Sequence, residues 1–262
     1  MKKIAIMTAG GDCAGLNAAI KAVVMAASKN NIVVVGIIDG FIGFVERKYM
    51  VLDNKIVENI ERQGGTILGS SNKECPFHYP SKEKKGEFED RVDDSIKALK
   101  KIGVEAMIII GGDGTLDSAR VIDEAGMPTI GIPKTIDNDM VASNPTIGFD
   151  TGVENAVEAI RKLKTTAASH RRVMVVEMMG RTSGYLTLYS GFAAGADIIL
   201  LPERDYDLNI VCNRVKEIMN TDKRYVIIAV SEACKERGKK ETISKVCLLY
   251  TSPSPRDMRR SR

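Results

Sequence analysis

The sequence predicts an α/β fold made of two doubly wound, Rossmann-like domains whose sheets are mainly parallel. Runs of β-branched residues alternate with amphipathic helical stretches, and several runs end in glycines just before a helix. The alternation restarts after Phe149. We therefore expect a first domain over residues 1–148 and a second over residues 149–246, followed by a non-native tail over residues 247–262.

The first forty residues predict a βαβ unit with a right-handed crossover: a strand at residues 4–8, a helix at 16–28 and a strand at 32–38. Val92, Ile96 and Leu99 lie at helical spacing and mark the core side of another helix. The elements expected to complete this domain are a strand at 107–110, a helix at 116–124 and a strand at 129–132.

The second domain repeats this pattern. Apolar residues at helical spacing from Val153 to Leu163 predict a helix that opens it. The elements expected to follow are a strand at 172–177, a helix at 183–194, a strand at 198–201, a helix at 208–218 and a strand at 225–230. Strands separated by helices in this way predict a second parallel sheet.

Composition excludes several classes of function. The 262 residues contain no apolar run long enough to cross a membrane and no signal peptide. Residues 247–262 hold four arginines and one aspartate, so they supply +3 of the net charge of +4. The rest of the chain has no basic stripe for nucleic acid. We expect a cytoplasmic protein without nucleic-acid or membrane partners.

The cysteines form no C-x-x-C pair and are odd in number, which argues against a zinc site and a disulfide framework. We expect all five to be free thiols. They are Cys13, Cys75, Cys212, Cys234 and Cys247.

Two glycine-rich loops are candidates for binding an anion. TAGGDCAGLN at residues 8–17 turns a strand into a helix, and its glycines let backbone N–H groups approach a phosphate. GGTILGSSN at residues 64–72 is a flexible polar loop suited to a nucleotide. Neither loop has Walker A or G-x-G-x-x-G spacing. A tight βα turn or an ordinary surface loop is therefore the alternative for each.

IIIGGDGT at residues 108–115 places Asp113 between glycines at the end of a buried strand, where a Mg²⁺-phosphate site needs a carboxylate. An Asx turn is the alternative.

GIPKTIDND at residues 131–139 concentrates polar chemistry behind an apolar run. We expect Lys134 to lie just past the end of a strand, and Thr135, Asp137 and Asp139 to share one side of an extended segment. One carboxylate can accept a hydroxyl proton while the lysine neutralises phosphate charge. A helix cap or turn cluster is the alternative.

EMMGRTSG at residues 177–184 predicts a phosphate clamp, with Arg181 at a helix start beside Gly180. A surface arginine is the alternative. Glu232 likewise follows a strand end. Arg172 precedes a strand, so we expect it to point away from this site and to serve a neighbouring subunit.

In this order the motifs resemble the phosphofructokinase family, kinases and pyrophosphate-dependent enzymes that phosphorylate fructose 6-phosphate at its 1-hydroxyl. The stretches that carry the resemblance lie within residues 1–235: GGDCAGLN, GGTILGS, GGDGT, PKTIDND, TIGFDTG, HRR, EMMGR and SEA. The resemblance implies a phosphofructokinase-like fold and a 6-phosphofructokinase that uses ATP with Mg²⁺. It further implies a homo-oligomer in which Arg172 reaches the sugar phosphate of an adjacent subunit.

The resemblance also implies roles for the matched residues. Asp137 would be the base for the 1-hydroxyl, and Asp113 would hold the metal. The other residues implied in catalysis are Thr135, Arg181 and Lys134. Those implied to bind ATP are Gly11, Asn72, Gly112, Asp113, Gly114 and Thr115. Those implied to bind the sugar phosphate are Thr135, Asp137, Asp139, Arg172, Met179, Gly180, Arg181 and Glu232.

Three positions bear on the phosphoryl donor. Gly114 is typical of nucleotide-using members, because pyrophosphate-using members carry a bulkier aspartate there that blocks the α-phosphate. Lys134 is found in pyrophosphate-using and in some ATP-using members. Asn72 replaces an arginine that many ATP-using relatives place near the γ-phosphate. We expect the mixed, ATP-using group, with a pyrophosphate-dependent phosphofructokinase as the alternative.

The end of the chain departs from the family pattern. Members continue after the last strand with an arginine, a histidine and another arginine that complete the sugar-phosphate site, whereas residues 247–262 resemble a translated sequencing adapter. We expect the second domain to be incomplete and this chain to be impaired in stability and activity, unlike a full-length parent. The alternatives are another kinase that shares GGDGT and a non-catalytic nucleotide-binding fragment or subunit.

Overall fold

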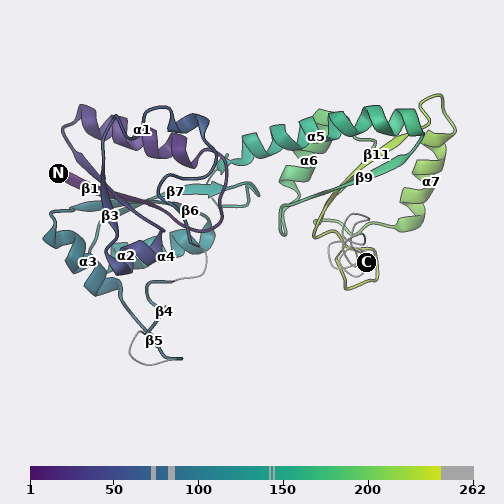
Figure 1. Ribbon diagram of the computed structural model, residues 1–262. Coiled ribbons are helices and arrows are strands. Elements are labelled where there is room, and N and C mark those ends of the chain that lie inside the picture. The colour runs from purple at the N-terminus through teal and green to yellow at the C-terminus, as the bar shows by residue number, and fades with distance from the viewer. Residues whose placement is uncertain (72–74, 82–85, 142, 144, 243–262) are drawn as a thin grey trace, which may run out of the picture. The chain divides into compact units, whose positions relative to one another are not determined.

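The computed structural model describes residues 1–71, 75–81, 86–141, 143 and 145–242. The chain divides into two compact units (Figure 1). Unit 1 contains Met1–Ile136 and Met140–Gly148, and unit 2 contains Asp137–Asp139 and the chain from Phe149 onward.

Unit 1 is built on a six-stranded sheet that is parallel except for β3, which runs antiparallel to β2. In sheet order the strands are β3 (Tyr49–Leu52), β2 (Val33–Ile37), β1 (Lys3–Thr8), β6 (Ala106–Gly111), β7 (Thr129–Thr135) and β8 (Ile147–Gly148). A separate two-stranded hairpin pairs β4 (Tyr79–Pro80) with β5 (Phe88–Glu89). The parallel pairs require helical crossovers, and those helices cover both faces of the sheet.

In Figure 1, α1 lies on one face of this sheet and α2, α3 and α4 lie on the other. The helices are α1 (Leu16–Lys29), α2 (Phe41–Glu46), the 3₁₀ helix η1 (Ile60–Arg62), α3 (Val92–Lys101) and α4 (Asp113–Glu124). On α3 the three residues predicted to face the core, Val92, Ile96 and Leu99, are all buried.

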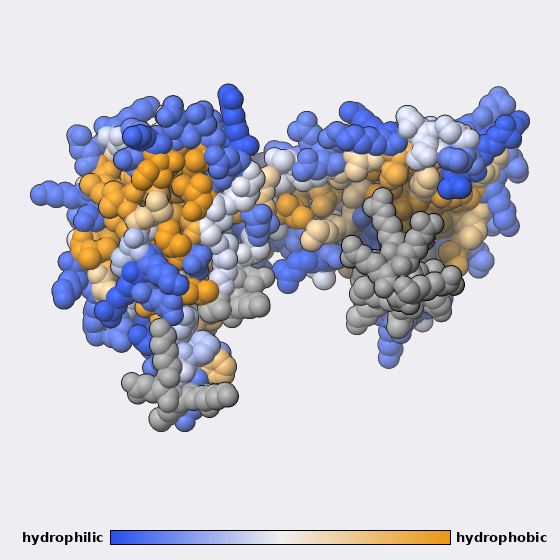
Figure 2. Space-filling view, in the orientation of Figure 1, coloured by the Kyte–Doolittle hydropathy of each residue, from blue (hydrophilic) through white to orange (hydrophobic). Residues whose placement is uncertain are grey.

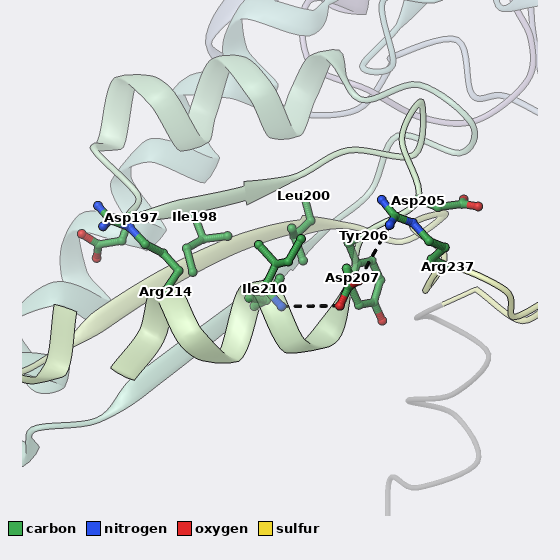
Figure 3. A pocket seen from close by; sticks show the side chains of 10 residues that line it. Asp197, Ile198, Leu200, Asp205, Tyr206, Asp207, Ile210, Arg214 and Arg237 are labelled. Carbon is green, nitrogen blue, oxygen red and sulfur yellow. Dashed lines mark hydrogen bonds and ion pairs between the residues drawn. The ribbon is translucent and has the colours of Figure 1, made fainter. Parts of the chain in front are cut away.

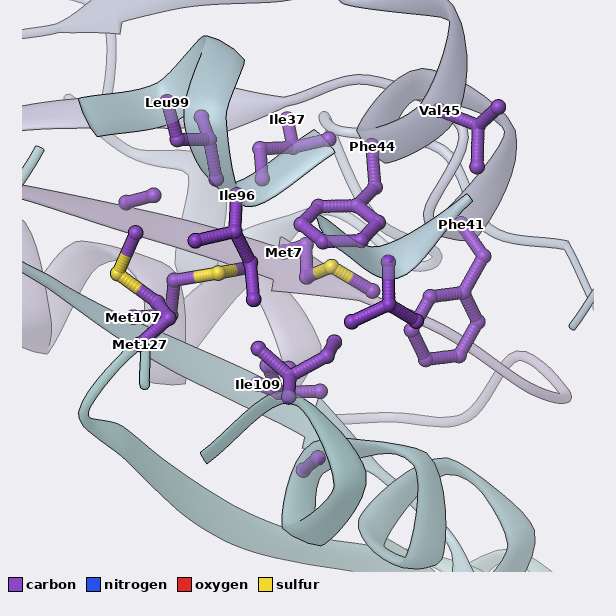
Figure 4. Packing of buried hydrophobic residues seen from close by; sticks show 14 of the residues in the cluster. Met7, Ile37, Phe41, Phe44, Val45, Ile96, Leu99, Met107, Ile109 and Met127 are labelled. Carbon is purple, nitrogen blue, oxygen red and sulfur yellow. The ribbon is translucent and has the colours of Figure 1, made fainter. Parts of the chain in front are cut away.

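The side chains on the two faces of the sheet pack into two separate hydrophobic cores, because successive residues of a strand point to opposite faces. In β1, Ala5 and Met7 join the core under α2, α3 and α4, whereas Ile4 and Ile6 join the core under α1. Figure 4 shows the first of these cores, with Phe44 packed near Met7. Burial on both faces explains why this strand is a continuous apolar run.

Unit 2 has a three-stranded parallel sheet in the order β10 (Ile198–Leu200), β11 (Val226–Ser231), β9 (Val173–Met178). The helices are α5 (Phe149–His170), α6 (Tyr185–Ala194) and α7 (Leu208–Met219). The central strand again divides its residues between two cores: Ile227 and Ala229 pack with α5 and α6, and Val226 and Ile228 pack with α7.

The predicted fold class is confirmed, and several predicted bounds are corrected. The expected strand at 129–132 continues to Thr135, so Lys134 and Thr135 lie within the strand rather than past its end. α4 begins at Asp113, because the GGDGT turn is already the first turn of the helix. α6 begins at Tyr185, so Arg181 belongs to the preceding turn and not to a helix start.

Neither α2 nor the antiparallel strand β3 was predicted from the sequence. After β2 the chain passes through α2 and then runs back antiparallel to β2 as β3, which forms one edge of the sheet. Figure 2 shows hydrophobic side chains gathering over this part of unit 1, and Val51 of β3 is exposed.

Within the described part of the chain, no helix has the length and apolar character needed to span a membrane. The four cysteines placed there are free thiols.

Candidate active site

In unit 1, the glycine turns predicted to bind an anion follow two neighbouring strands. β1 and β6 pair in parallel at the centre of the sheet. The strand that follows β1 along the chain, β2, lies on one side of this pair, and the strand that follows β6, β7, lies on the other. A reversal of this kind opens a crevice at the carboxyl ends of the two strands, where doubly wound sheets bind ligands. Gly10 and Gly11 follow β1 at this edge, and Gly112 follows β6.

Three contacts hold the loop that follows β1. The Gly10 N–H donates to the Ser71 carbonyl at 2.9 Å, and the Ser70 hydroxyl donates to the Gly10 carbonyl at 2.6 Å. The Lys134 ammonium donates to the Gly11 carbonyl at 2.5 Å. Lys134 is only 5% exposed, so this side chain from β7 brings a buried ammonium group to the loop. A fixed glycine loop above a lysine is suited to a phosphate.

The turn after β6 is packed against the same loop. A Cβ on Gly111 would lie 2.3 Å from the Thr115 Cγ2 atom, and a Cβ on Gly10 would lie 3.2 Å from Thr115 Oγ1. Glycine is therefore favoured at position 111 by the close approach of Thr115, which is buried, and at position 10 by a left-handed φ of 84°. The predicted anion loop and the GGDGT turn form one packed structure.

Asp113 and Gly114 open the first turn of α4 and are exposed. The helix has Gly112 at its N-cap and no side-chain cap, so its first N–H groups can meet a ligand. A Cβ on Gly114 would meet nothing within 4 Å. This open surface beside a carboxylate is compatible with a bound nucleotide.

The segment after β7 bends instead of continuing as extended chain. Thr135 ends the strand, Ile136 and Asp137 form a bend, and Asn138 takes a left-handed φ of 51°. The expected alternation that puts Thr135, Asp137 and Asp139 on one side is therefore wrong, because period-two alternation requires continuous extended backbone. Asp137 is 7% exposed and Asp139 is exposed.

In unit 2, Asp137 is tied to the turn that carries Arg181. The Ser183 hydroxyl donates to the Asp137 carbonyl at 2.9 Å in a buried contact. At the other end of the turn, one carboxylate oxygen of Glu232, Oε1, accepts the N–H of Gly180 at 3.0 Å and of Arg181 at 2.7 Å. Thus Asp137, Arg181 and Glu232 belong to one hydrogen-bonded group.

Cys234 lies two residues beyond Glu232 and is fully buried, whereas Cys212 on α7 is exposed. Burial raises the pKa of the Cys234 thiol to about 11 from an ordinary value of 9.0. We expect iodoacetamide at about pH 8 to modify Cys212 and to leave Cys234 intact in the folded protein. Peptide mass spectrometry would measure this, and equal labelling of both thiols would contradict it.

The raised pKa of Cys234 also determines how the stability of the folded protein changes with pH. The unfolded chain releases the Cys234 proton near pH 9.0, whereas the folded chain keeps it to about pH 11. The contribution of this thiol to stability is therefore present below pH 9.0 and is lost as the pH rises to about 11.

A hollow in unit 2, with a volume of about 380 Å³, lies between β10 and α7 (Figure 3). Ile198, Leu200 and Ile210 lie along its middle, with Asp197 and Arg214 toward one end and Asp207 and Arg237 toward the other. None of the residues predicted to bind ATP or the sugar phosphate lines it. The hollow is therefore separate from the candidate site.

Comparison with known proteins identifies the family. The sequence model of the family described as Phosphofructokinase matches residues 3–259. The chain belongs to the phosphofructokinase family. It is 45% identical, over 258 residues, to "ATP-dependent 6-phosphofructokinase 2" from Clostridium perfringens, covering 97% of this chain and 70% of that relative. It is also 45% identical, over 233 residues, to "ATP-dependent 6-phosphofructokinase" from Streptococcus thermophilus, covering 88% of this chain and 66% of that relative.

A solved structure of phosphofructokinase from Saccharomyces cerevisiae has the same fold as the present chain, with a TM-score of 0.78 at 29% identity. The match covers 90% of this chain and 34% of the yeast chain. The present chain therefore spans about two thirds of the bacterial relatives and a third of the yeast one.

The residues that the phosphofructokinase resemblance implies fall into two groups. Unit 1 holds Gly11, Gly112, Asp113, Gly114, Thr115, Lys134 and Thr135. Unit 2 holds Asp137, Asp139, Arg172, Met179, Gly180, Arg181 and Glu232. Asn72 lies outside the described residues. Arg172 directly precedes β9, at the opposite end of that strand from Met179, and its role at a neighbouring subunit stays a prediction.

Three polar residues that hold these groups in place were not predicted from the sequence. Ser183 contacts Asp137, Glu203 accepts the N–H of Gly184 at 2.7 Å, and Ser70 holds the loop after β1. Ser70 and Ser183 lie inside motifs that were singled out, so their hydroxyls were visible candidates. Glu203 follows a strand end as Glu232 does, which is the signal that could have found it.

Proposed function

We infer that this chain is a 6-phosphofructokinase that transfers a phosphoryl group from ATP to the 1-hydroxyl of fructose 6-phosphate. The observation that carries this function is 45% identity to an ATP-dependent 6-phosphofructokinase across 97% of the chain. The glycine turns at the switch point of unit 1 support a phosphate-binding role. Such an enzyme is a phosphotransferase with an alcohol acceptor.

Unit 1 is proposed to bind the phosphoryl donor. Gly11 offers its backbone to the transferred phosphoryl, and Lys134, buried beneath that loop, offsets negative charge. Gly112, Gly114 and Thr115 frame the first turn of α4, where an anion is favoured.

Asp113 is the residue that would hold Mg²⁺. The described residues contain no cluster of three or more metal-binding side chains. One exposed carboxylate nevertheless fits this ion, because protein-bound Mg²⁺ keeps several waters and takes substrate phosphates as ligands. Bound there, the ion supplies charge neutralisation for phosphoryl transfer.

Unit 2 is proposed to act on the sugar phosphate. Asp137 accepts the proton of the 1-hydroxyl as the general base, and Arg181 stabilises charge on the phosphoryl group. Thr135, which belongs to unit 1, is proposed to assist at the reacting end. The residues proposed to contact the sugar phosphate are Thr135, Asp137, Asp139, Met179, Gly180, Arg181 and Glu232, with Arg172 supplied by a neighbouring subunit.

A homo-oligomer with a cytoplasmic location is part of this proposal, and nothing in it calls for nucleic acid or a membrane. The charge distribution supports the first exclusion, since most of the net positive charge lies in residues 247–262.

Gly114 gives a direct test of donor choice. A Cβ added at Gly114 meets nothing within 4 Å, and a carboxylate there would lie in the first turn of α4, where negative charge is stabilising, so Gly114→Asp should fold. We expect this variant to lose about tenfold or more in kcat/KM for ATP, since a carboxylate would repel the nucleotide phosphates. Gly114→Ala, which adds a Cβ without charge, is the matched control.

The assay is best run on two proteins: the 262-residue chain, and the same chain carrying the C-terminal segment of the Clostridium perfringens relative, here called the extended protein. Formation of fructose 1,6-bisphosphate is followed with ATP or pyrophosphate as the donor. We expect turnover with ATP and little with pyrophosphate in the extended protein. Turnover by the extended protein with pyrophosphate alone would reject the ATP-dependent function.

A further inference from the structure

The turn between β9 and α6 has backbone geometry that its own contacts enforce. The Ser183 N–H donates to the Gly180 carbonyl at 2.8 Å and closes the turn. Gly180 has φ 146°, a conformation that L side chains rarely adopt, and a Cβ there would lie 2.5 Å from the Ser183 carbonyl oxygen. Arg181 has φ 51°. A non-glycine residue in the left-handed region persists where surrounding contacts hold it.

Both ends of this turn are anchored by hydrogen bonds to distant parts of the chain: the contact to Asp137 is buried, that of the Gly180 N–H is partly buried and that of the Arg181 N–H is exposed. Glu232 Oε1 accepts the N–H groups of Gly180 and Arg181, and the Glu232 N–H itself donates to the Met178 carbonyl at 2.9 Å. These contacts align the ends of β9 and β11. A carboxylate that accepts two backbone N–H groups makes charge-assisted bonds, which are stronger than neutral ones.

The other anchor reaches Asp137. Ser183 is 7% exposed, and its hydroxyl donates to the Asp137 carbonyl rather than to its side chain. The contact fixes the backbone from which the Asp137 carboxylate projects. Asp137 sits in a bend beside Asn138, whose φ is 51°, so its position depends on such contacts more than that of a strand residue does.

We propose that the Gly180–Ser183 turn is a clamp that fixes Arg181 and Asp137 relative to each other, with Glu232 and Ser183 as its positioning residues. The catalytic purpose of the clamp rests on the proposed function, whereas the clamp itself is a property of unit 2. Glu232 thereby has a task beyond contact with a sugar hydroxyl. A base and a charge-stabilising group must be held to a fraction of an ångström, since a misplacement of about 1 Å can cost about 100-fold in rate.

Ser190 provides a matched control for Ser183. It is a fully buried serine on α6 whose hydroxyl donates to the Leu186 carbonyl, so Ser190→Ala also removes one buried hydrogen bond to a backbone carbonyl. Its partner is within the same helix and not in the proposed site. A purely structural role for Ser183 predicts that the two alanine variants behave alike.

In the extended protein, we expect Ser183→Ala to lower kcat by about tenfold or more and to leave KM for ATP nearly unchanged. Ser190→Ala should give a similar drop in melting temperature with kcat close to that of the unaltered protein. Equal kcat values for the two variants would overturn the role of Ser183. A Ser183→Ala loss that appears only in KM would overturn it as well, because positioning of the base acts on kcat.

A second measurement tests whether the clamp exists and does not depend on enzyme activity. Hydrogen exchange of the 262-residue chain, followed residue by residue, should show the Gly180 and Arg181 amides exchanging about tenfold or more faster in Glu232→Ala, since both N–H groups lose their acceptor. Glu232→Gln keeps an acceptor oxygen and should stay close to the unaltered protein. Unchanged exchange in Glu232→Ala would reject the clamp, whereas absence of product from the unaltered extended protein would reject only the proposed function.

Discussion

Replacing Asp137 with asparagine should lower the kcat of the extended protein by about 10²- to 10⁴-fold, the usual contribution of a general base. KM for fructose 6-phosphate should change little, because the amide has the same size and can still hydrogen bond. Asp137 is 7% exposed, so an isosteric replacement also avoids opening a void. Steady-state kinetics at saturating ATP would measure both constants.

Asp94→Asn is the control for this experiment. Asp94 is an exposed carboxylate in the first turn of α3, and its loss should leave kcat unchanged. An Asp137→Asn enzyme with the unaltered rate would remove Asp137 as the base. A loss confined to KM would make Asp137 a binding residue instead.

Gly43→Ala should strongly destabilise unit 1. Gly43 is buried within α2, and a Cβ there would lie 1.7 Å from the backbone oxygen of Ile38. That oxygen cannot move freely, because the Ile38 N–H donates to the Lys48 carbonyl at 3.0 Å and the chain is anchored to β3. The variant should lose about 3 kcal/mol of stability, at the upper end of the usual cost of overpacking.

Gly114→Ala is the matched control for Gly43→Ala, since both glycines are helical and neither has a positive φ. An added methyl group at Gly114 meets nothing within 4 Å, so its effect on stability should stay below about 1 kcal/mol. The midpoint of urea unfolding would measure both variants. Equal midpoints would show that the α2 backbone yields to the added methyl group.

The fold was predictable from the sequence because strands that are buried on both faces of a sheet are nearly continuous apolar runs, which can be recognised in the sequence. β1, β6 and β11 are largely apolar runs, and a glycine turn and a helix follow both β1 and β6. The short strand β3 was not predictable in the same way. It is a four-residue edge strand with one buried residue, so its sequence carries too little periodicity to distinguish it from a loop.

The candidate site was predictable only to the level of motifs. The glycine turns of unit 1 and the EMMGR stretch were identified by residue type and place along the chain. At residues 131–139 an extended segment was expected and a turn was only the alternative, although Asn138, whose φ is 51°, is of a type that adopts the left-handed region more readily than most. The Ser183 contact to Asp137 joins residues 46 positions apart, and the Glu232 contacts join residues more than 50 apart. Such pairs follow from the fold and cannot be read from local sequence.

The most direct test of the account is to identify the product that the extended protein forms from ATP and fructose 6-phosphate. Phosphorus NMR distinguishes a new phosphate at the 1-position from phosphate released to water and from phosphorylation elsewhere on the sugar. We expect ADP and fructose 1,6-bisphosphate in equal amounts, with Asp137→Asn giving neither at a comparable rate. ADP with free phosphate only, or a different acceptor preferred over fructose 6-phosphate, would contradict it.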